Sequence, residues 1–370
     1  MPVPRIYATC DIGPAALDRL RVRGWELEIY PGPEPPPHEL VVAKVAGGVD
    51  ALVTTLRDTV DEAVFAAGAR ARLRVVAQMA VGVDNIDRAA ANRHRIPFGH
   101  TPDVLTDATA EFAFFILGAV ARKTWPSEQW VRSGQWTGWH PSLPFLGDEV
   151  SGKTLAVIGT GRIGKALINK AVGLDLDIVA HDPKGEDRDF ASAIRAVMRV
   201  RHATGLCRRA QTLAWVPLDE ALARADFVSL HVPLVAARPG RDSTHHLLDE
   251  RRLGLMKPTA YLVNTARGPV VDEVALARAL REGRIAGAAL DVFETEPLPA
   301  ESPLRDPALA DRVRLFHHFA SAGRATRLSP DPDVGMAGRA VQVVIDVLAG
   351  AYGGDLARVP FIVNREAFEE

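Results

Sequence analysis

Three polar segments, each following an apolar stretch typical of a strand, carry side chains suited to acid–base chemistry. They are Asn264-Thr265-Ala266-Arg267-Gly268, Asp291-Val292-Phe293-Glu294-Thr295-Glu296-Pro297 and His317-His318-Phe319-Ala320-Ser321. An arginine can bind anionic oxygens, a histidine can transfer a proton, and a carboxylate can stabilise the charged histidine. Each residue alone would more often be structural. Because the carboxyl ends of parallel strands share one crevice, we expect these side chains to converge there. Reduction of a keto acid needs a hydride donor, a cation for the substrate's oxygens and an acid for the nascent alkoxide, and these residue types could supply the last two.

A candidate site for that donor lies upstream, where the apolar run 154–158 leads into Gly159-Thr160-Gly161-Arg162-Ile163-Gly164. Such glycines permit a tight turn, close approach of a diphosphate and helix–strand packing, while the helix N-terminus favours the anion. Asp182 ends the next predicted strand, where a ribose hydroxyl needs an acceptor, which favours NAD. NADP stays possible because Lys184 is close in sequence, and a solvated loop aspartate is the alternative interpretation of Asp182. His231, Val232 and Pro233 leave a further strand and could lie beside the cofactor's ribose.

Short apolar runs alternate with helical patterns along the chain, which predicts an α/β fold with two doubly wound parallel-sheet domains. The proline-rich stretch 31–37 is expected to be a loop. The predicted strands are 5–9, 25–30, 51–54, 73–78 and 96–98 in the first part, and 154–158, 176–180, 227–231, 260–264, 288–292 and 313–316 in the second. A Rossmann order fits the second set.

Helical patterns connect these parts. Residues 107–123 predict a helix that bridges the domains, capped by Thr106 or Asp107, and residues 340–348 predict a last helix that returns to the first domain. The segment 182–217 is rich in arginine and predicts an insertion with at least one amphipathic helix. A solvated basic surface is favoured there over phosphate recognition.

Four of the six tryptophans, Trp125, Trp130, Trp136 and Trp139, lie in one short segment. Clustered aromatic side chains indicate a buried contact, either with a second subunit or within the same chain. The sequence alone leaves both alternatives open.

Composition narrows the function classes. With 370 residues, 47% hydrophobic content and a net charge of −2, the chain can bury two cores and has no general affinity for polyanions, so we expect no nucleic acid partner. Cys10 and Cys207 are too few for a disulfide framework or a zinc motif, so we expect no metal. Residues 1–5 lack secretory features, and the apolar run 112–121 is too short to span a bilayer. We therefore expect a cytoplasmic protein without membrane contact.

These motifs resemble the NAD-dependent D-2-hydroxyacid dehydrogenase family, over nearly the whole chain. The matching elements are the glycine turn with Asp182 and the segments 263–268, 291–297 and the one around His318. Within that family the chain is most similar to glyoxylate/hydroxypyruvate reductases, on the stretches 79–87, 101–110 and 132–139. The resemblance implies hydride transfer between NAD(H) and a small 2-keto acid or D-2-hydroxy acid.

The resemblance also implies a domain arrangement. Residues 1–103 and 320–370 would form a discontinuous, flavodoxin-like substrate domain. Residues 104–319 would form a Rossmann NAD-binding domain inserted into it. A dimer arm around 124–148 would join two copies, so a homodimer is expected.

Roles for single residues follow from the same resemblance. Arg267 would bind the substrate's carboxylate and carbonyl oxygen, His318 would be the acid–base group, and Glu296 would pair with His318. Backbone N–H groups around Val81 and Gly82 would hold the carboxylate. Leu56 and Trp139 would form pocket walls beside Arg267. The cofactor would contact Thr109, Gly159, Gly161, Arg162, Ile163, Gly164, Asp182, His231, Val232, Pro233, Thr265, Ala266 and Asp291, with Thr109 near the nicotinamide and Asp291 on its carboxamide.

The chain departs from the family around the histidine, where Pro-His-Ile-Gly is usual and His317-His318-Phe319-Ala320 stands here. His317 is therefore a rival for the acid–base role, although alignment through Ser321 and Arg324 favours His318. Two functional alternatives stay open. One is a dehydrogenase of another acid, such as 2-ketogluconate; phosphite is disfavoured because 80–82 lacks lysine. The other is a nucleotide-sensing binding protein similar to corepressors of this fold.

Overall fold

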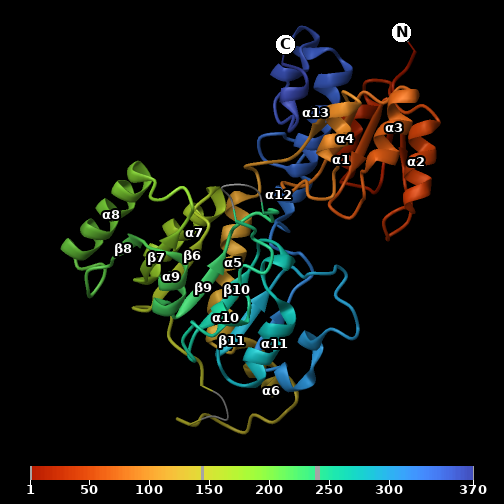
Figure 1. Cartoon of the computed structure of the whole chain (residues 1–370). Helices are drawn as coiled ribbons and strands as arrows, with labels where there is room; N and C mark the ends of the chain where they lie inside the picture. The colour runs from red at the N-terminus through yellow and green to blue at the C-terminus, as the bar shows by residue number, and fades with distance from the viewer. Residues whose placement is uncertain (1, 143–145, 238–241, 370) are drawn as a thin grey trace. The chain divides into compact units, whose positions relative to one another are not determined.

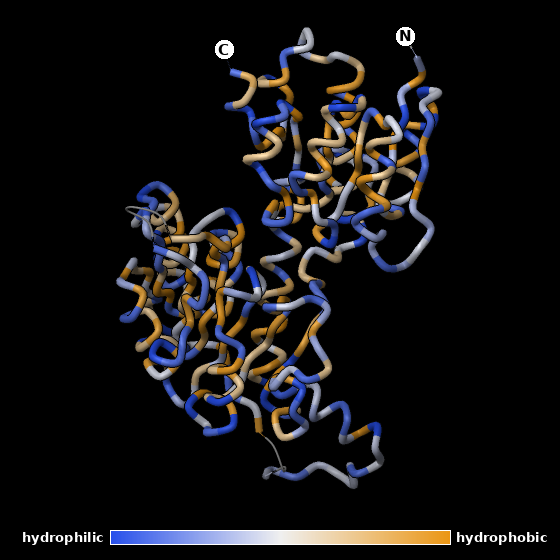
Figure 2. The backbone as a smooth tube through the Cα atoms, turned by 45° about the vertical axis from the view of Figure 1, so that its right-hand side comes forward, coloured by the Kyte–Doolittle hydropathy of each residue, from blue (hydrophilic) through white to orange (hydrophobic). Residues whose placement is uncertain are grey.

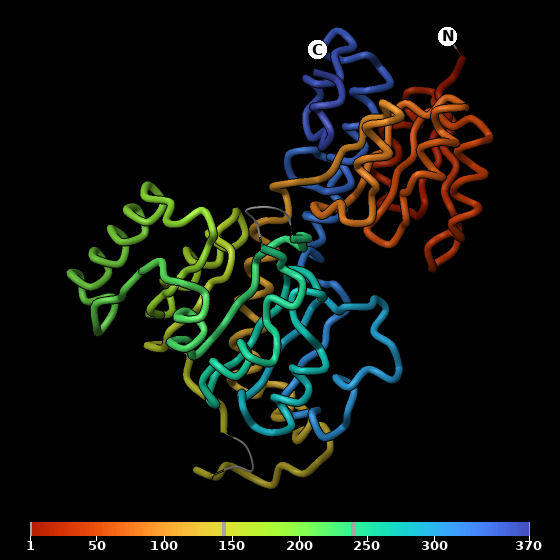
Figure 3. Tube along the Cα trace, in the orientation of Figure 1, coloured from red at the N-terminus to blue at the C-terminus, as the bar shows by residue number. Residues whose placement is uncertain are grey.

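The computed structural model describes residues 2–142, 146–237 and 242–369. The chain separates into two compact units, Met1–Leu105 with Ala322–Glu370 and Thr106–Ser321. The first unit is therefore built from both ends of the chain, which the colours at the two termini in Figures 1 and 3 make visible. Each unit contains one parallel sheet, so the predicted fold class is confirmed.

The first unit holds a five-stranded parallel sheet in the order β2-β1-β3-β4-β5, which is the flavodoxin-like order. All five strands predicted for this part are present, with bounds within two residues of the prediction. The strands are β1 (Arg5–Ala8), β2 (Glu26–Ile29), β3 (Ala51–Thr54), β4 (Val75–Gln78) and β5 (Phe98–Gly99).

Helices cover both faces of this sheet, and strands β3 and β4 accordingly bury side chains on both sides. One core contains residues of α1 (Pro14–Arg21) and α13 (Met336–Leu348), so the last long helix of the chain joins the first domain as predicted. The other core contains residues of α2 (His38–Ala46), α3 (Glu62–Arg70) and α4 (Arg88–Arg93). The remaining helices are α12 (Arg324–Leu328), η5 (Ala351–Gly354), η6 (Leu356–Arg358) and η7 (Arg365–Ala367).

The second unit holds a seven-stranded parallel sheet in the order β12-β11-β10-β9-β6-β7-β8. The strands are β6 (Thr154–Ile158), β7 (Asp177–His181), β8 (Leu213–Trp215), β9 (Phe227–Leu230), β10 (Tyr261–Asn264), β11 (Gly287–Leu290) and β12 (Val313–Leu315). Six of them match the predicted strands, and the order is that of a Rossmann fold extended by β12. The order reverses between β6 and β9, where ligands of such sheets bind.

Two cores flank this sheet. One contains residues of α5 (Thr106–Ala121), α7 (Arg162–Ala171) and α8 (Arg188–Ala203). The other contains residues of α9 (Leu218–Arg224), α10 (Glu250–Leu253) and α11 (Glu273–Arg281). The unit is completed by α6 (Thr124–Arg132), η1 (Val172–Leu174), η2 (Gly268–Val270), η3 (Pro303–Arg305) and η4 (Pro307–Leu309). Figure 2 shows apolar segments running through the interior of each unit.

Three predictions about segments can be compared with this fold. The predicted helix 107–123 is α5, and the predicted amphipathic helix of the arginine-rich insertion is α8. Strand β8 was not predicted, and it forms the sheet edge directly after that insertion. Among the described helices, none has the length and apolar character needed to cross a membrane.

Candidate active site

The glycine turn after β6 has three glycines with three different tasks. Gly159 has a φ of +96°, and a Cβ there would lie 2.7 Å from the carbonyl oxygen of His231. A Cβ on Gly164 would lie 2.0 Å from the carbonyl oxygen of Gly159, so only glycine lets α7 pack so closely. A Cβ on Gly161 would meet no atom within 4 Å. The turn therefore leaves open space at Gly161, where a diphosphate can approach the backbone.

Asp182 follows β7 and bonds to this turn. Its carboxylate accepts the N–H of Thr160 at 2.9 Å and the Thr160 hydroxyl at 3.3 Å, and its other oxygen accepts the N–H of Lys184 at 3.0 Å. The alternative of a solvated loop aspartate does not describe this geometry. No side chain caps the N-terminus of α7, so its first turn keeps an anion-binding end.

Further predicted cofactor residues line the neighbouring strand ends. Thr265, which is 8% exposed, carries a buried hydroxyl that has no hydrogen-bond partner among the described residues. Such an orphaned hydroxyl fits a group supplied by a bound cofactor. Ala266 and Val232 are buried, and Thr109 is buried on α5.

His231 is half-buried, and its ring contacts a buried side chain of β9. Its Nε2 lies 2.8 Å from the hydroxyl oxygen of the buried Ser229. Burial lowers the pKa of His231 to about 4, because the charged imidazolium loses its hydration. Its ring is therefore neutral at pH 7.

His318, the predicted acid–base residue, and Glu296, its predicted partner, form a direct pair. His318 Nδ1 lies 2.9 Å from Glu296 Oε2, and Glu296 Oε1 accepts the N–H of Phe293 at 3.0 Å. Burial acts to raise the pKa of Glu296, but the hydrogen bond and charge of His318 outweigh it. The N–H of Phe293 and the charge of Arg267 add to this effect and hold that pKa below its usual value. The described contacts join Glu296 to His318, whereas the ring of His317 lies 5.2 Å from that of Phe319.

The turn that carries His318 is fixed by Asp291, which is fully buried. The carboxylate of Asp291 accepts the N–H groups of Phe319 at 2.6 Å and Ala320 at 2.8 Å, and its carbonyl oxygen accepts the N–H of His318 at 2.8 Å. Burial raises the pKa of Asp291 despite these N–H groups. Both carboxylate oxygens of Asp291 thus serve the turn, a task that the sequence did not indicate.

Arg267 follows β10 on a loop that contacts the Glu296 loop. Asn264 Nδ2 donates to the carbonyl oxygen of Arg267 at 2.9 Å, and Arg267 donates to the carbonyl oxygen of Ala266 at 2.7 Å. A Cβ on Gly268 would lie only 1.8 Å from the carbonyl carbon of Phe293. The loops that carry the three predicted catalytic residues therefore meet at the carboxyl ends of strands in the second unit's sheet.

A second contact between these loops was not found from the sequence. The N–H of Glu273, at the start of α11, donates to Glu294 Oε1 at 3.0 Å, and the N–H of Glu294 donates back to Glu273 Oε1 at 2.6 Å. The only local signal is a pair of glutamates, one of them at a helix start five residues after Gly268. This reciprocal pair of hydrogen bonds forms only when the two loops are folded against each other, so the spacing of the glutamates in the sequence does not reveal it.

The predicted substrate residues are spread over separate loops. Leu56, which is 41% exposed, follows β3, and the half-buried Val81 and Gly82 follow β4, so these lie on adjacent loops of the first unit. Trp139 is 84% exposed. The described residues contain no group of three or more His, Cys, Asp or Glu side chains that could hold a metal ion.

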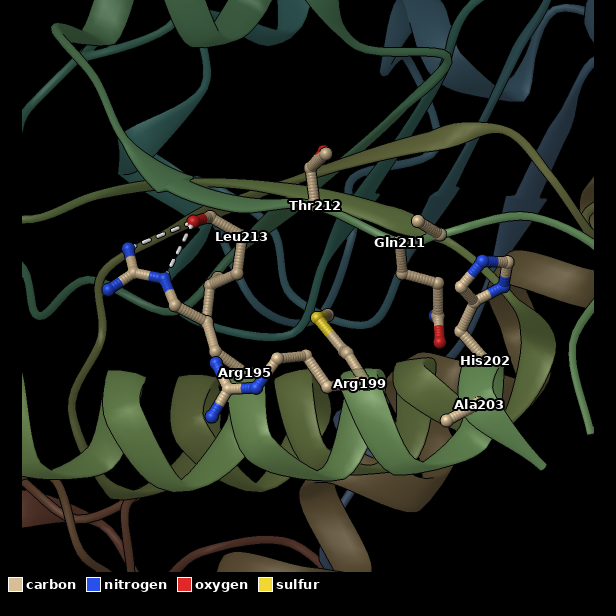
Figure 4. A pocket seen from close by; sticks show the side chains of 9 residues that line it. Arg195, Arg199, His202, Ala203, Gln211, Thr212 and Leu213 are labelled. Carbon is tan, nitrogen blue, oxygen red and sulfur yellow. Dashed lines mark hydrogen bonds between the residues drawn. The ribbon is translucent and has the colours of Figure 1, made fainter.

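The arginine-rich insertion forms a cavity of about 400 Å³ between α8 and the residues before β8 (Figure 4). Arg195 lines it, but its guanidinium already donates to the carbonyl oxygen of Leu213 and to Glu186. Arg199 and His202 lie near the C-terminus of α8, where a helix dipole favours cations and disfavours anions. This geometry agrees with a basic surface rather than a phosphate site, and the cavity precedes β8, away from the carboxyl ends of the strands.

Comparison with known proteins gives consistent results. The family model described as the NAD binding domain of D-isomer specific 2-hydroxyacid dehydrogenases matches residues 114–320. The glyoxylate reductase of Korarchaeum cryptofilum is 38% identical over 364 residues, which cover 98% of this chain and 96% of that protein. A solved structure from Thermus thermophilus is 36% identical with a TM-score of 0.80, covering 97% of this chain and 99% of that chain.

A second solved structure bears on the cofactor. It is the NADPH-dependent glyoxylate/hydroxypyruvate reductase of Sinorhizobium meliloti in complex with NADP and malonate. It is 27% identical with a TM-score of 0.75, and the match covers 100% of this chain and 99% of that one.

Proposed function

The chain belongs to the D-isomer specific 2-hydroxyacid dehydrogenases, an NAD(P)-dependent group of oxidoreductases, and on that premise we propose that it reduces glyoxylate or hydroxypyruvate to the 2-hydroxy acid. The names of its relatives support this substrate class. The observation that carries the proposal is the His318–Glu296 pair at 2.9 Å, beside the Arg267 loop and on the sheet that bears the glycine turn.

The glycine turn, Asp182 and the orphaned hydroxyl of Thr265 are the residues that would hold the dinucleotide. When bound, the reduced nicotinamide supplies the hydride that reaches the carbonyl carbon. The carboxylate of Asp182 would accept the ribose hydroxyl and repel a phosphate at that position. We therefore propose a preference for NADH, in contrast to the Sinorhizobium enzyme.

The chain's own residues supply the rest of the chemistry. Protonated His318 gives its proton to the carbonyl oxygen, and Glu296 stabilises the imidazolium before that transfer. Arg267 binds the substrate's oxygens and counters the negative charge that develops on them. The N–H groups of Val81 and Gly82, in the first unit, bind the carboxylate.

The direct test is steady-state reduction of a panel of 2-keto acids with NADH and with NADPH, for wild type and variants. We expect Arg267→Ala and His318→Ala to lower kcat/KM by roughly 100-fold or more, since each removes a charge or proton donor used in the transition state. His317→Ala is the matched control and should stay near wild type. Turnover close to wild type in either test variant would refute the assigned role. NADH binding without turnover of any acid would favour a sensor.

We also propose a homodimer joined through the segment 124–148. Three of its tryptophans are exposed in the single chain, Trp125 at 51%, Trp136 at 55% and Trp139 at 84%. Packing within the chain therefore leaves these rings open to water. A second copy would cover them, because large exposed aromatic side chains are typical of interfaces.

A further inference from the structure

Two amide side chains of the first unit, one buried and one half-buried, bind each other. Gln78 ends β4 and is fully buried, and Asn85 lies seven residues later in the loop that follows. Gln78 Nε2 donates to Asn85 Oδ1 at 2.8 Å, and Asn85 Nδ2 donates back to Gln78 Oε1 at 3.0 Å. Such a reciprocal pair fixes both amide planes, so the remaining N–H groups point in set directions.

Those remaining contacts tie two loops together. Gln78 Nε2 also donates to the carbonyl oxygen of Gly82 at 2.7 Å. Asn85 Nδ2 reaches the carbonyl oxygens of Thr55 at 3.2 Å and Asp58 at 2.6 Å. The pair therefore holds the loop after β3, which carries Leu56, against the loop after β4. Both loops contain residues proposed to contact the substrate.

The same pair sets the direction of one of three consecutive peptide groups, the one between Gly82 and Val83, and other residues hold the two peptide groups before it. The carbonyl oxygens of Ala80, Val81 and Gly82 accept hydrogen bonds from the N–H of Thr101 at 2.9 Å, His100 Nδ1 at 2.9 Å and Gln78 Nε2 at 2.7 Å. In a trans peptide the N–H of the next residue points opposite to the carbonyl oxygen. The N–H groups of Val81, Gly82 and Val83 thus point away from these protein partners.

No acceptor for these three N–H groups exists among the residues that the structure describes. Backbone N–H groups without a protein acceptor are available to bind an anion. We propose that Gln78 and Asn85 are positioning residues that hold this N–H set for the substrate's carboxylate and keep the Leu56 loop beside it. The inference rests on the proposed function, in which a 2-keto acid binds these N–H groups.

The test is Gln78→Glu, which keeps the shape but cannot donate to the carbonyl oxygen of Gly82. We expect the KM for glyoxylate to rise roughly tenfold or more, because two hydrogen bonds are replaced by repulsion between oxygens. The Kd of NADH should stay within about twofold, since the glycine turn belongs to the other unit. Asn85→Asp and Gln78→Met should also raise KM. These two variants replace Gln78→Glu in the test if Gln78→Glu does not fold.

The matched control is Gln211→Glu. Gln211 is also a buried amide that donates to two carbonyl oxygens, those of Val172 at 3.1 Å and Leu176 at 3.0 Å, but it lies in the second unit before β8. The KM of Gln211→Glu should equal that of wild type even if the temperature of thermal unfolding changes. A KM within twofold of wild type in folded Gln78→Glu and Asn85→Asp would overturn the inference, as would equal changes in KM and in the Kd of NADH.

Oxalate, a carboxylate that cannot be reduced, separates this inference from the proposed function. If wild type binds oxalate in the NADH complex but does not reduce glyoxylate, the proposed substrate is wrong, and the oxalate Kd of the variants still tests the pair. Weaker oxalate binding in Gln78→Glu and Asn85→Asp, with an unchanged Gln211→Glu, would support it. Oxalate binding equal to wild type in both would contradict it.

Discussion

Gly268→Ala tests whether the contact between the Arg267 loop and the Glu296 loop sets the activity. The added Cβ would lie 1.8 Å from the carbonyl carbon and oxygen of Phe293 and 2.4 Å from the nitrogen of Glu294. Ordinary van der Waals contact begins near 3.4 Å, so the two backbones must separate by about 1.6 Å. No flexible side chain is available to absorb this change, because every one of these neighbours is backbone.

Two measurable consequences follow from that separation. Overpacking of this kind lowers the free energy of unfolding by about 1–3 kcal/mol. A shift of roughly 1 Å between catalytic groups costs on the order of 100-fold in rate, and Arg267 is adjacent to the altered glycine. We therefore expect kcat/KM to fall by about 100-fold while most of the chain stays folded.

The assay is steady-state reduction of the best 2-keto acid with NADH, combined with urea unfolding of the same samples. Gly173→Ala is the control, because a Cβ on the exposed Gly173 would meet no atom within 4 Å. It should leave both measurements unchanged. If Gly268→Ala kept kcat/KM within threefold of wild type at equal unfolding free energy, the close approach of the two loops would not control the site.

Three further predictions concern the cofactor, pH and assembly. Gly161→Ala should weaken NADH binding without changing stability, because its Cβ would enter the open space of the turn; a fluorescence titration measures the Kd, and an unchanged value would contradict the role of that space. His231 has a pKa of about 4 in the folded chain against 6.5 for a free histidine, so the unfolded chain takes up the proton first. The free energy of unfolding should therefore fall by up to roughly 3 kcal/mol as pH drops from about 6.5 to 4, and His231→Gln should flatten this slope in urea titrations at several pH values. In light scattering, wild type should have twice the 40.0 kDa mass of one chain, and the double variant Trp136→Ser with Trp139→Ser should have the mass of a monomer. A mass equal to that of wild type would place the interface elsewhere.

The strands that were predicted are those with a local signal. Runs such as 154–158 and 51–54 are apolar at every position except one threonine each, because parallel strands bury both faces, and this pattern can be recognised without knowledge of the neighbouring strands. Strand β8 has only three residues at the sheet edge, and the polar Gln211 and Thr212 precede it. Residues 213–215 form a strand because they pair with β7, and the local sequence does not reveal this pairing.

The candidate site likewise contains residues that the sequence predicted and contacts that it did not. The glycine turn, Arg267, Glu296 and His318 were found because each lies in a short motif at a strand end. The Gln78–Asn85 pair and the Glu273–Glu294 exchange were missed, although 79–87 was singled out as a motif. An amide or glutamate gives no sign of its partner in the sequence, since the partner is selected by the folded geometry.

The Asp291 contacts have a consequence for how this site can change over evolution. Asp291 holds the turn around His318 through main-chain N–H groups, and such bonds are the same for every residue type except proline. The side chains of His317 and Phe319, both exposed, take no part in these main-chain hydrogen bonds. Replacement of the side chains at positions 317 and 319 therefore leaves these main-chain hydrogen bonds in place, so the surface beside the proposed acid–base group can change its character while the turn keeps its anchor.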